Sequence, residues 1–292
     1  MSTSRGPTVR QRRLGIELRR LREQNDLTGE EVAARFSWST AKVSRLENAR
    51  TGIRVDDVVE LLKLYGVVGG RLEELVALAH DATRRGWWEE YSSLGATYAE
   101  LIALESEASA ALQWENLVVP GLLQTEAYAR GVLAGWEVVA TLTDQEMRES
   151  FEARMRRQEV LRGPQPMELS AVLDESILQR RVGDPATMAE QLDHLCQISR
   201  LPNVSLKILP LDTPRALLAT SFTLLKFPRA HDVQFPDIVH TESLTLSFHK
   251  DDKETDRYKR AFGQLDEESL GAAETRELLA EARDHWLSRG GV

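Results

Sequence analysis

Apolar residues recur at helical spacing over the first 85 residues and predict five short helices. The positions that share the inward face of each helix are Leu14, Leu18 and Leu21, then Val32, Ala33 and Phe36, then Val43 and Leu46, then Val58, Leu61, Leu62 and Tyr65, and last Leu72, Leu75, Val76 and Ala79. Residues 1–9 are mostly small and polar, so they are predicted to form a disordered arm. The pattern indicates an all-α domain over residues 10–85.

Two capping signals mark helix starts within residues 28–48. Thr28 and Glu31 have the spacing of a capping box, in which the hydroxyl and the carboxylate each satisfy an unpaired backbone N–H. Ser39 is a favourable N-cap residue for the next helix, which is expected to end near Asn48. These signals predict two short helices joined by a tight turn.

The helix predicted over residues 39–48 has one polar face. Val43 and Leu46 lie on its apolar side at 100° per residue. The residues on the opposite side are Thr40, Ala41, Ser44, Arg45 and Asn48, with Lys42 beside them and Arg50 beyond the helix end. A helix of this size fits the major groove of DNA, where such side chains contact base edges or phosphates. A helical hairpin with a solvated polar face explains the same spacing.

Beyond residue 86 the hydrophobic period alternates between that of helices and that of strands. The predicted helices are residues 98–114, a helix capped by Thr125, and residues 143–161, 185–200, 252–264 and 270–288. The predicted strands are residues 168–174 and 204–210, with two or three more within 221–227 and 237–248. Residues 86–292 are therefore predicted to form an α+β domain with a small sheet and several helices.

Charge divides the chain in the same way. Residues 1–54 hold twelve Lys and Arg against six Asp and Glu, whereas the whole chain has a net charge of −9. A basic head on an acidic body fits DNA contact through the head alone. The acidic excess of the body could also attract a basic partner, or it could serve only to keep the protein soluble.

The sequence lacks the residue patterns that are typical of several classes of function. The single Cys196 excludes an internal disulfide and a Cys-rich zinc site. The six histidines form no ligand pair, and neither a nucleophile elbow nor a phosphate-binding glycine loop is present. We therefore predict a protein that is not an enzyme and holds no metal or cofactor. No apolar run approaches the roughly 20 residues of a membrane span, and no signal peptide is recognised, so a cytoplasmic protein is expected.

The head resembles the helix-turn-helix domain of the Xre family, the phage repressor and Cro type. The residues that carry the resemblance are Leu27, Thr28, Glu31, Val32 and Ala33, followed by Ser39 and the run Val43–Asn48. The resemblance implies a five-helix, phage-repressor-like fold whose third helix occupies the major groove. Thr40, Ala41 and Arg45 match base-facing positions of that family.

The same resemblance implies further roles. Gly29, Lys42, Asn48 and Arg50 match phosphate-facing positions, and Arg22 and Glu47 match a buried ion pair between the first and third helices. Ser37 and Ala49 stand where the family often has glycine. A non-glycine residue at positive φ costs about 1 kcal/mol, so turns of a different shape are expected at these two positions.

The second region resembles a C-terminal domain of actinobacterial Xre regulators, domain of unknown function 5753, which is described as antitoxin-like. The residues that carry this resemblance are Trp87, Trp88 and Tyr91, Leu104–Ala108, Pro120–Thr125 with Tyr128 and Ala129, Arg157 and Gln158, and Gln191, Leu192 and Leu195. It implies a regulator often encoded beside a small protein with domain of unknown function 397, which binds it.

Aromatic and amide residues near the predicted boundary are candidates for a partner or ligand surface. These residues are Trp87, Trp88, Tyr91, Gln124 and Tyr128. Packing at a domain junction explains the tryptophans equally, and a Pro-Gly turn followed by a helix cap explains residues 120–125.

We hypothesise a sequence-specific DNA-binding transcriptional regulator that reads double-stranded DNA with residues 39–48. A homodimer is expected because one short helix contacts few base pairs. Two alternatives remain open, an antitoxin-like protein that neutralises or is controlled by a small partner, and a regulator that senses a small molecule.

Overall fold

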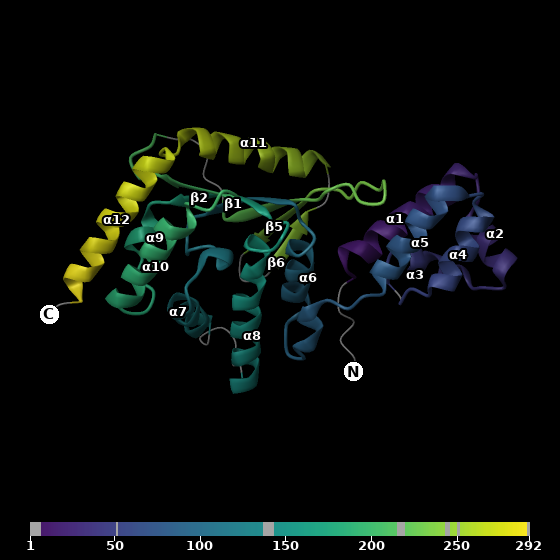
Figure 1. The fold of residues 1–292 in the computed structure, drawn as a ribbon, viewed down its shortest axis with the longest axis horizontal. Coiled ribbons are helices and arrows are strands. Elements are labelled where there is room, and N and C mark those ends of the chain that lie inside the picture. The colour runs from purple at the N-terminus through teal and green to yellow at the C-terminus, as the bar shows by residue number, and fades with distance from the viewer. Residues whose placement is uncertain are drawn as a thin grey trace. The chain divides into compact units, whose positions relative to one another are not determined.

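The computed structural model describes residues 7–50, 52–136, 143–214, 220–242, 246–249 and 252–290. They form two compact units. The helical unit comprises Met1–Glu90, Gly95–Glu107 and Pro228–Phe235, and the sheet unit comprises Tyr91–Leu94, Ala108–Phe227 and Pro236–Val292. The predicted fold class, a helical N-terminal domain followed by an α+β domain, is confirmed (Figure 1).

The helical unit contains the five predicted helices and two further helical segments. They are α1 (Val9–Gln24), α2 (Gly29–Phe36), α3 (Thr40–Glu47), α4 (Val55–Leu64), α5 (Gly69–Ala82), the 3₁₀ helix η1 (Trp87–Glu90) and α6 (Ala96–Glu105). The predicted apolar positions at 14, 18 and 21, 43 and 46, and 58, 61 and 62 are buried in one shared core. Local periodicity therefore predicted this core correctly.

The start of α1 differs from the prediction of a disordered arm over residues 1–9. Residues 1–6 lie outside the described part of the chain. Thr8 is the N-cap of α1 and forms a capping box with Gln11, while Val9 is the first helical residue and is buried. The arm prediction is wrong for residues 7–9 because a threonine three residues before a glutamine satisfies the first N–H groups of a helix.

Helices α1 and α3 approach each other closely at Gly15. A Cβ atom added to Gly15 would overlap with the backbone carbonyl oxygen of Glu47. The backbone of α3 therefore packs directly on α1, and only glycine fits at this position without displacement.

The helical unit extends beyond the boundary predicted at Gly86. It includes α6 and the segment Pro228–Phe235, which connects strands β4 and β5 of the sheet. Val233 of this segment is buried in the core of the helical unit. Arg13 donates a hydrogen bond from Nη2 to the Pro228 carbonyl oxygen at 2.9 Å. Sequence patterns could not show that a segment 140 positions downstream completes this core.

In the residues that the structure describes, the sheet unit is built on six strands in the order β3-β2-β1-β4-β5-β6. Their bounds are β1 (Ala110–Glu115), β2 (Glu168–Asp174), β3 (Val204–Leu209), β4 (Phe222–Lys226), β5 (Ile238–Glu242) and β6 (Leu246–His249). Strands β1, β2 and β3 pair in parallel, and β4, β5 and β6 continue the sheet in antiparallel pairs from β1. The predicted strands at 168–174 and 204–210 are confirmed.

Strand β1 was missed because residues 98–114 were predicted as one helix. Helix α6 ends at Glu105, and β1 begins five residues later. Leu101, Leu104 and Leu112 have helical spacing, but Leu112 and Trp114 alternate on a strand whose face packs under α11. The pairing of β1 with both β2 and β4 overrides the local helical preference of this segment.

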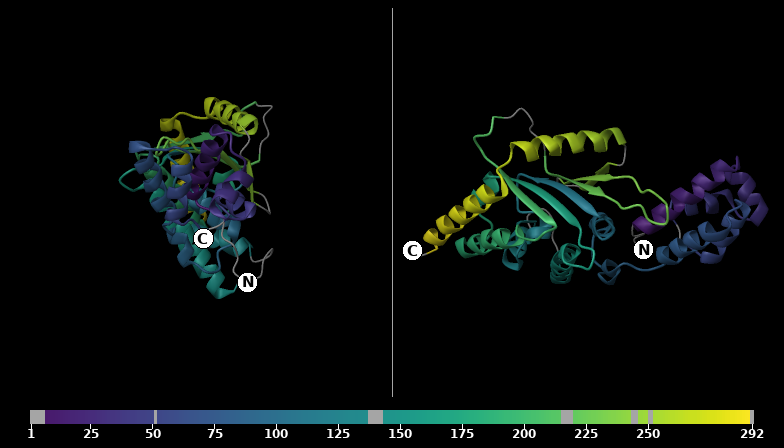
Figure 2. Two further views of the ribbon diagram at one scale, coloured as in Figure 1. Left: turned by 90° about the vertical axis from the view of Figure 1, so that its right-hand side faces the viewer. Right: turned by 45° about the horizontal axis from the view of Figure 1, so that its top comes forward.

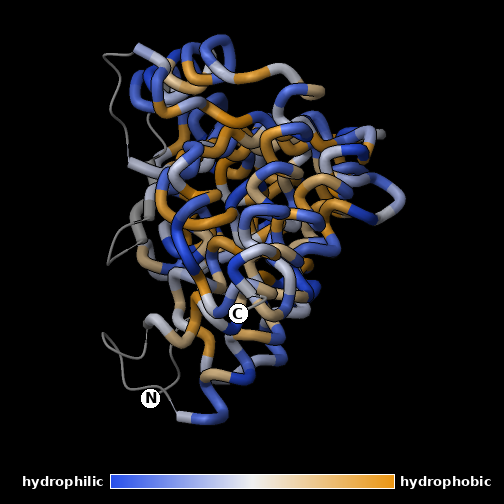
Figure 3. The backbone as a smooth tube through the Cα atoms, turned by 90° about the vertical axis from the view of Figure 1, so that its left-hand side faces the viewer, coloured by the Kyte–Doolittle hydropathy of each residue, from blue (hydrophilic) through white to orange (hydrophobic). Residues whose placement is uncertain are grey.

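Helices cover the sheet. They are η2 (Gly121–Leu123), α7 (Glu126–Trp136), α8 (Asp144–Arg156), η3 (Arg157–Leu161), α9 (Ser176–Gln179), α10 (Pro185–Ile198), α11 (Asp252–Glu268) and α12 (Ala272–Arg289). Helix α11 crosses one face of the sheet, where Phe262 and Leu265 pack on Trp114, Phe222 and Leu224 (Figure 2). Hydrophilic and hydrophobic positions alternate along the helices, as expected of amphipathic helices (Figure 3).

Among the helices that the structure describes, none is both long enough and apolar enough to cross a membrane.

Candidate DNA-binding surface

The turn between α2 and α3 has the geometry that glycine usually provides. Ser37 has φ 54° and Ala49, just after α3, has φ 53°. Trp38 N–H donates to the Ala33 carbonyl oxygen at 2.9 Å and so closes the end of α2. The expectation that these turns would be shaped differently is wrong. Both residues take the left-handed conformation at a cost of about 1 kcal/mol each.

Helix α3 begins and is oriented as predicted. The Ser39 hydroxyl accepts a hydrogen bond from Lys42 N–H at 3.2 Å, and Val43 and Leu46 are buried. The residues left exposed on its other side are Thr40, Ala41, Ser44, Arg45 and Asn48. Asn48 Nδ2 donates to the Ser44 carbonyl oxygen at 2.7 Å and so covers part of the C-terminal end of the helix. The helix therefore presents one continuous polar face to solvent.

Arg22 of α1 lies against Glu47 of α3. Its Nε and Nη2 atoms donate to the two carboxylate oxygens at 2.6 and 3.0 Å, and Nη1 donates to the Leu27 carbonyl oxygen at 2.7 Å. These hydrogen bonds to Glu47 raise the pKa of Arg22. Bidentate pairs of this kind fix geometry as well as adding energy. One guanidinium therefore joins α1, the loop before α2, and α3.

Lys42 is held by neighbouring residues in the free protein. Its Nζ lies 2.7 Å from Asp57 Oδ2 on α4 and 3.6 Å from the centre of the Trp38 ring. A contact from Lys42 to a phosphate would therefore compete with Asp57. Arg45 and Arg50 are exposed and have no ion-pair partner among the described residues.

A shallow groove joins α3 to the start of α2. The side chains and backbone that line it include Arg19, Thr28, Gly29, Thr40, Ser44 and Asn48. Gly29 is the first residue of α2, and a Cβ atom added there would lie 3.9 Å from Val43 Cγ1, an ordinary contact. Gly29 is therefore not required for packing, and its N–H lies at the positive end of a helix.

The tryptophans at the predicted boundary are packed against each other. Trp87 and Trp88 have ring centres 5.9 Å apart in an edge-on arrangement, and Trp88 is buried. A Cβ atom on Gly86 would overlap with the Trp88 ring. The packing interpretation holds for Trp88, while Trp87 is half-buried beside a small cavity of about 180 Å³. Tyr91 belongs to the sheet unit and is half-buried there.

Gln124 and Tyr128 were predicted as part of a partner or ligand surface, and this is wrong because both are buried. Gln124 Nε2 donates to the Val119 carbonyl oxygen at 2.7 Å, and Tyr128 Oη accepts from Val119 N–H at 3.2 Å. Gln191 adds two contacts, donating to Leu123 O and accepting from Thr125 N–H, both at 2.8 Å. The buried side chains satisfy the backbone of an irregular segment, as buried polar groups require.

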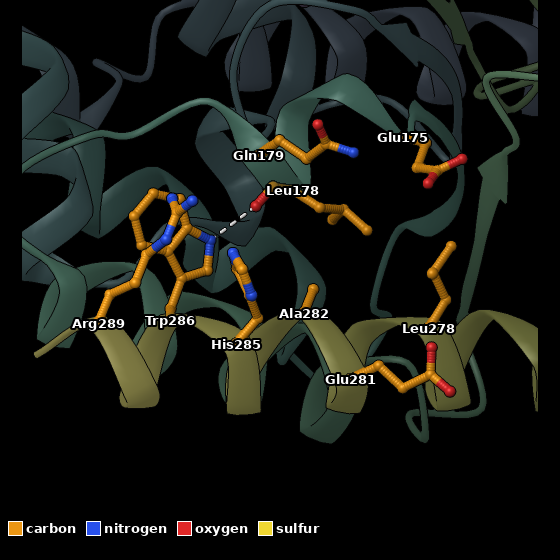
Figure 4. A pocket seen from close by; sticks show the side chains of 9 residues that line it. All are labelled: Glu175, Leu178, Gln179, Leu278, Glu281, Ala282, His285, Trp286 and Arg289. Atoms are coloured by element: carbon orange, nitrogen blue, oxygen red, sulfur yellow. Dashed lines mark hydrogen bonds between the residues drawn. The ribbon is translucent and has the colours of Figure 1, made fainter.

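The sequence did not point to a pocket that the structure shows in the sheet unit. It lies between α9 and α12 and has a volume of about 520 Å³ (Figure 4). Among the described residues, no group of three His, Cys, Asp or Glu side chains is placed to hold a metal ion.

The comparisons with known families agree with this architecture. Residues 13–75 match a helix-turn-helix domain, which indicates a DNA-binding regulator rather than an enzyme. Residues 98–281 match the family described as domain of unknown function (DUF5753), and the chain belongs to this family. No curated protein and no solved structure matched the chain significantly.

Proposed function

We propose that the protein is a sequence-specific transcriptional regulator of Xre type that lays α3 in the major groove of its operator. The observation that carries this proposal is the exposed polar face of α3, Thr40 to Asn48, on a helix held by the Arg22–Glu47 pair. A rigid helix with exposed hydrogen-bonding side chains has the properties needed to read base edges.

Two sets of residues take different roles in this proposal. Thr40, Ala41, Ser44 and Arg45 face the bases, and Arg45 is suited to a guanine through two parallel hydrogen bonds. Gly29, Ser39, Lys42, Asn48 and Arg50 contact the phosphate backbone, which gives affinity without sequence preference. The excess of basic residues before position 55 supports the second role.

We further propose that residues 10–85 form the DNA-binding domain and residues 86–292 the regulatory domain. A homodimer would double the base pairs read, because one short helix contacts few of them. We also propose the small protein with domain of unknown function 397 as the partner of the regulatory domain, and a location in the cytoplasm with the nucleoid.

Binding of the full chain to a duplex selected from a random library tests the proposal. Arg45→Ala should weaken binding to the selected site about tenfold to a hundredfold and relax the preference at one base pair, since a good base contact contributes about 1–3 kcal/mol. Lys42→Ala should weaken all duplexes alike and lower the salt slope by about one.

Lys63→Ala on α4, where the lysine pairs with Glu60, is the matched control and should leave base preference unchanged. If the Arg45 and Lys42 variants both bind like the parent over a salt series, α3 is not the reading helix.

An antitoxin-like interaction protein is the second candidate, favoured by the acidic excess outside residues 1–54. Here the acidic surface would bind a small basic partner, and DNA binding would be secondary. Co-purification of the full chain with that partner, followed by the same DNA-binding assay, distinguishes this candidate from the transcriptional regulator. Tight capture together with no selected duplex would favour this candidate.

A further inference from the structure

The pocket of the sheet unit between α9 and α12 has the size and fixed walls of a ligand site. Its volume of about 520 Å³ lies within the usual range for small-molecule pockets, about 300–1,000 Å³. Trp286 Nε1 of α12 donates to the Leu178 carbonyl oxygen of α9 at 2.8 Å, and Trp286 is buried. This hydrogen bond joins the two walls, so the pocket does not have to form when a ligand binds.

The charged groups of the pocket are not paired with each other. Glu281 and Arg289 of α12 have no ion-pair or hydrogen-bond partner among the residues that the structure describes. Glu175 uses one carboxylate oxygen to accept from Leu211 N–H at 2.9 Å, which orients the side chain and leaves the other oxygen available. Arg289 instead stacks over the Trp286 ring, 5.2 Å from its centre.

The opposite charges lie at opposite ends of the pocket. Figure 4 shows Glu175 and Glu281 toward one end, Arg289 with Trp286 toward the other, and His285 between them. Leu178, Leu278 and Ala282 supply apolar surface. Leu278 precedes Glu281 on α12 and lies at the acidic end, so the stretch between the acidic and the basic group is lined by Ala282 and His285 of α12 and by Leu178 of α9.

We propose that this pocket binds a small linear zwitterion. An ammonium group would lie near Glu281 and Glu175, an apolar chain would lie along Ala282 and Leu178, and a carboxylate or phosphate would meet Arg289. Glu281 and Arg289 are eight positions apart on one helix, which corresponds to about 12 Å between their backbones at 1.5 Å per residue. The ligand therefore carries its two charges at about this separation.

Calorimetric titration of the full chain with a series of ω-amino acids tests the proposal without DNA, so its failure leaves the proposed DNA binding unaffected. The probes are 4-aminobutanoate, 6-aminohexanoate and 8-aminooctanoate, with octylamine and octanoate as singly charged analogues. 8-Aminooctanoate should bind most tightly, at least about tenfold better than the shortest probe or either analogue, because only it reaches both charged ends.

Variants that remove one charge separate recognition from general adsorption. Glu281→Gln and Arg289→Gln should each weaken 8-aminooctanoate binding about tenfold, since each leaves one ligand charge unpaired. Glu277→Gln, an exposed residue of α12 that does not line the pocket, is the matched control and should bind like the parent. Equal thermal melting temperatures would show that all three variants are folded.

Three outcomes would overturn the proposal. The first is no saturable binding of any probe at millimolar concentration. The second is octylamine or octanoate binding as tightly as 8-aminooctanoate, which would mean recognition of one charge only. The third is unchanged affinity in both charge-removing variants, which would place the bound zwitterion elsewhere on the chain.

Discussion

Helix α3 and the segment Val118–Thr125 both carry recognisable sequence motifs, yet they place their polar side chains in opposite ways. In α3 the exposed residues Thr40, Ser44 and Arg45 keep their polar groups in solvent. In the second segment, Gln124 is buried and its side-chain amide donates a hydrogen bond to the Val119 carbonyl oxygen. The difference follows from the backbone, because a helix satisfies its own N–H and C=O groups and leaves its side chains available. An irregular buried segment needs side chains to satisfy those groups.

The largest effect should come from removing a side chain that serves the buried segment. Gln191→Ala leaves Thr125 N–H and the Leu123 carbonyl without their partner. Two unsatisfied buried groups should lower the free energy of unfolding by about 3 kcal/mol. Ser44→Ala on the exposed face of α3 should change it by less than about 0.5 kcal/mol. Urea unfolding of both variants measures the contrast, and equal stability would refute it.

A smaller loss is expected where α3 packs on α1. Gly15→Ala forces a methyl group into the Glu47 carbonyl, so one helix must shift, at a cost of about 2 kcal/mol. Gly29→Ala meets only an ordinary contact and should be nearly neutral. Hydrogen exchange of the α3 amides, together with urea unfolding, would show the difference. A Gly15→Ala protein as stable as Gly29→Ala would mean that α3 does not depend on this close approach.

The buried histidine of the sheet unit predicts a pH dependence of stability. Burial, with a smaller effect from the charge of Arg157, lowers the pKa of His240 to about 4. The unfolded chain, with a pKa of about 6.5, binds the proton more readily, so stability is full above pH 6.5 and falls as pH drops toward 4. The loss should be about 2 kcal/mol at pH 5.

Urea unfolding at pH 7 and pH 5 would measure this loss. The variant His240→Leu should lose that part of the pH dependence, because it has no group to protonate. An unchanged slope in the variant would assign the effect to other groups.

The smallest effect concerns the exposed surface itself. Asp57→Asn removes the carboxylate that holds Lys42, 2.7 Å from its Nζ. The lysine then no longer has to leave this carboxylate to contact a phosphate, so non-specific DNA affinity should rise about threefold with little change in the salt slope. Fluorescence anisotropy with a random duplex over a salt series would measure this change in affinity. Unchanged affinity would indicate that Lys42 lies away from the phosphates.

Much of the helical unit could be predicted from local patterns. The capping box at Thr28, the N-cap at Ser39, and the buried side of α3 all depend on residues within four positions of each other. Strands β2 and β3 were also recognisable, because each begins with alternating polar and apolar positions and continues into a short apolar run. Such signals do not require knowledge of distant partners.

The tertiary structure alone decided the rest, because those features depend on partners far along the chain. Residues 110–115 form a strand because β2 and β4 pair on either side of them. Val233 completes the helical core from more than 140 positions beyond α5, and Glu175 and Glu281 meet in one pocket although 106 positions separate them. Periodicity reports which side of an element is apolar. Burial of Gln124 and exposure of Arg45 are set by what packs against each element.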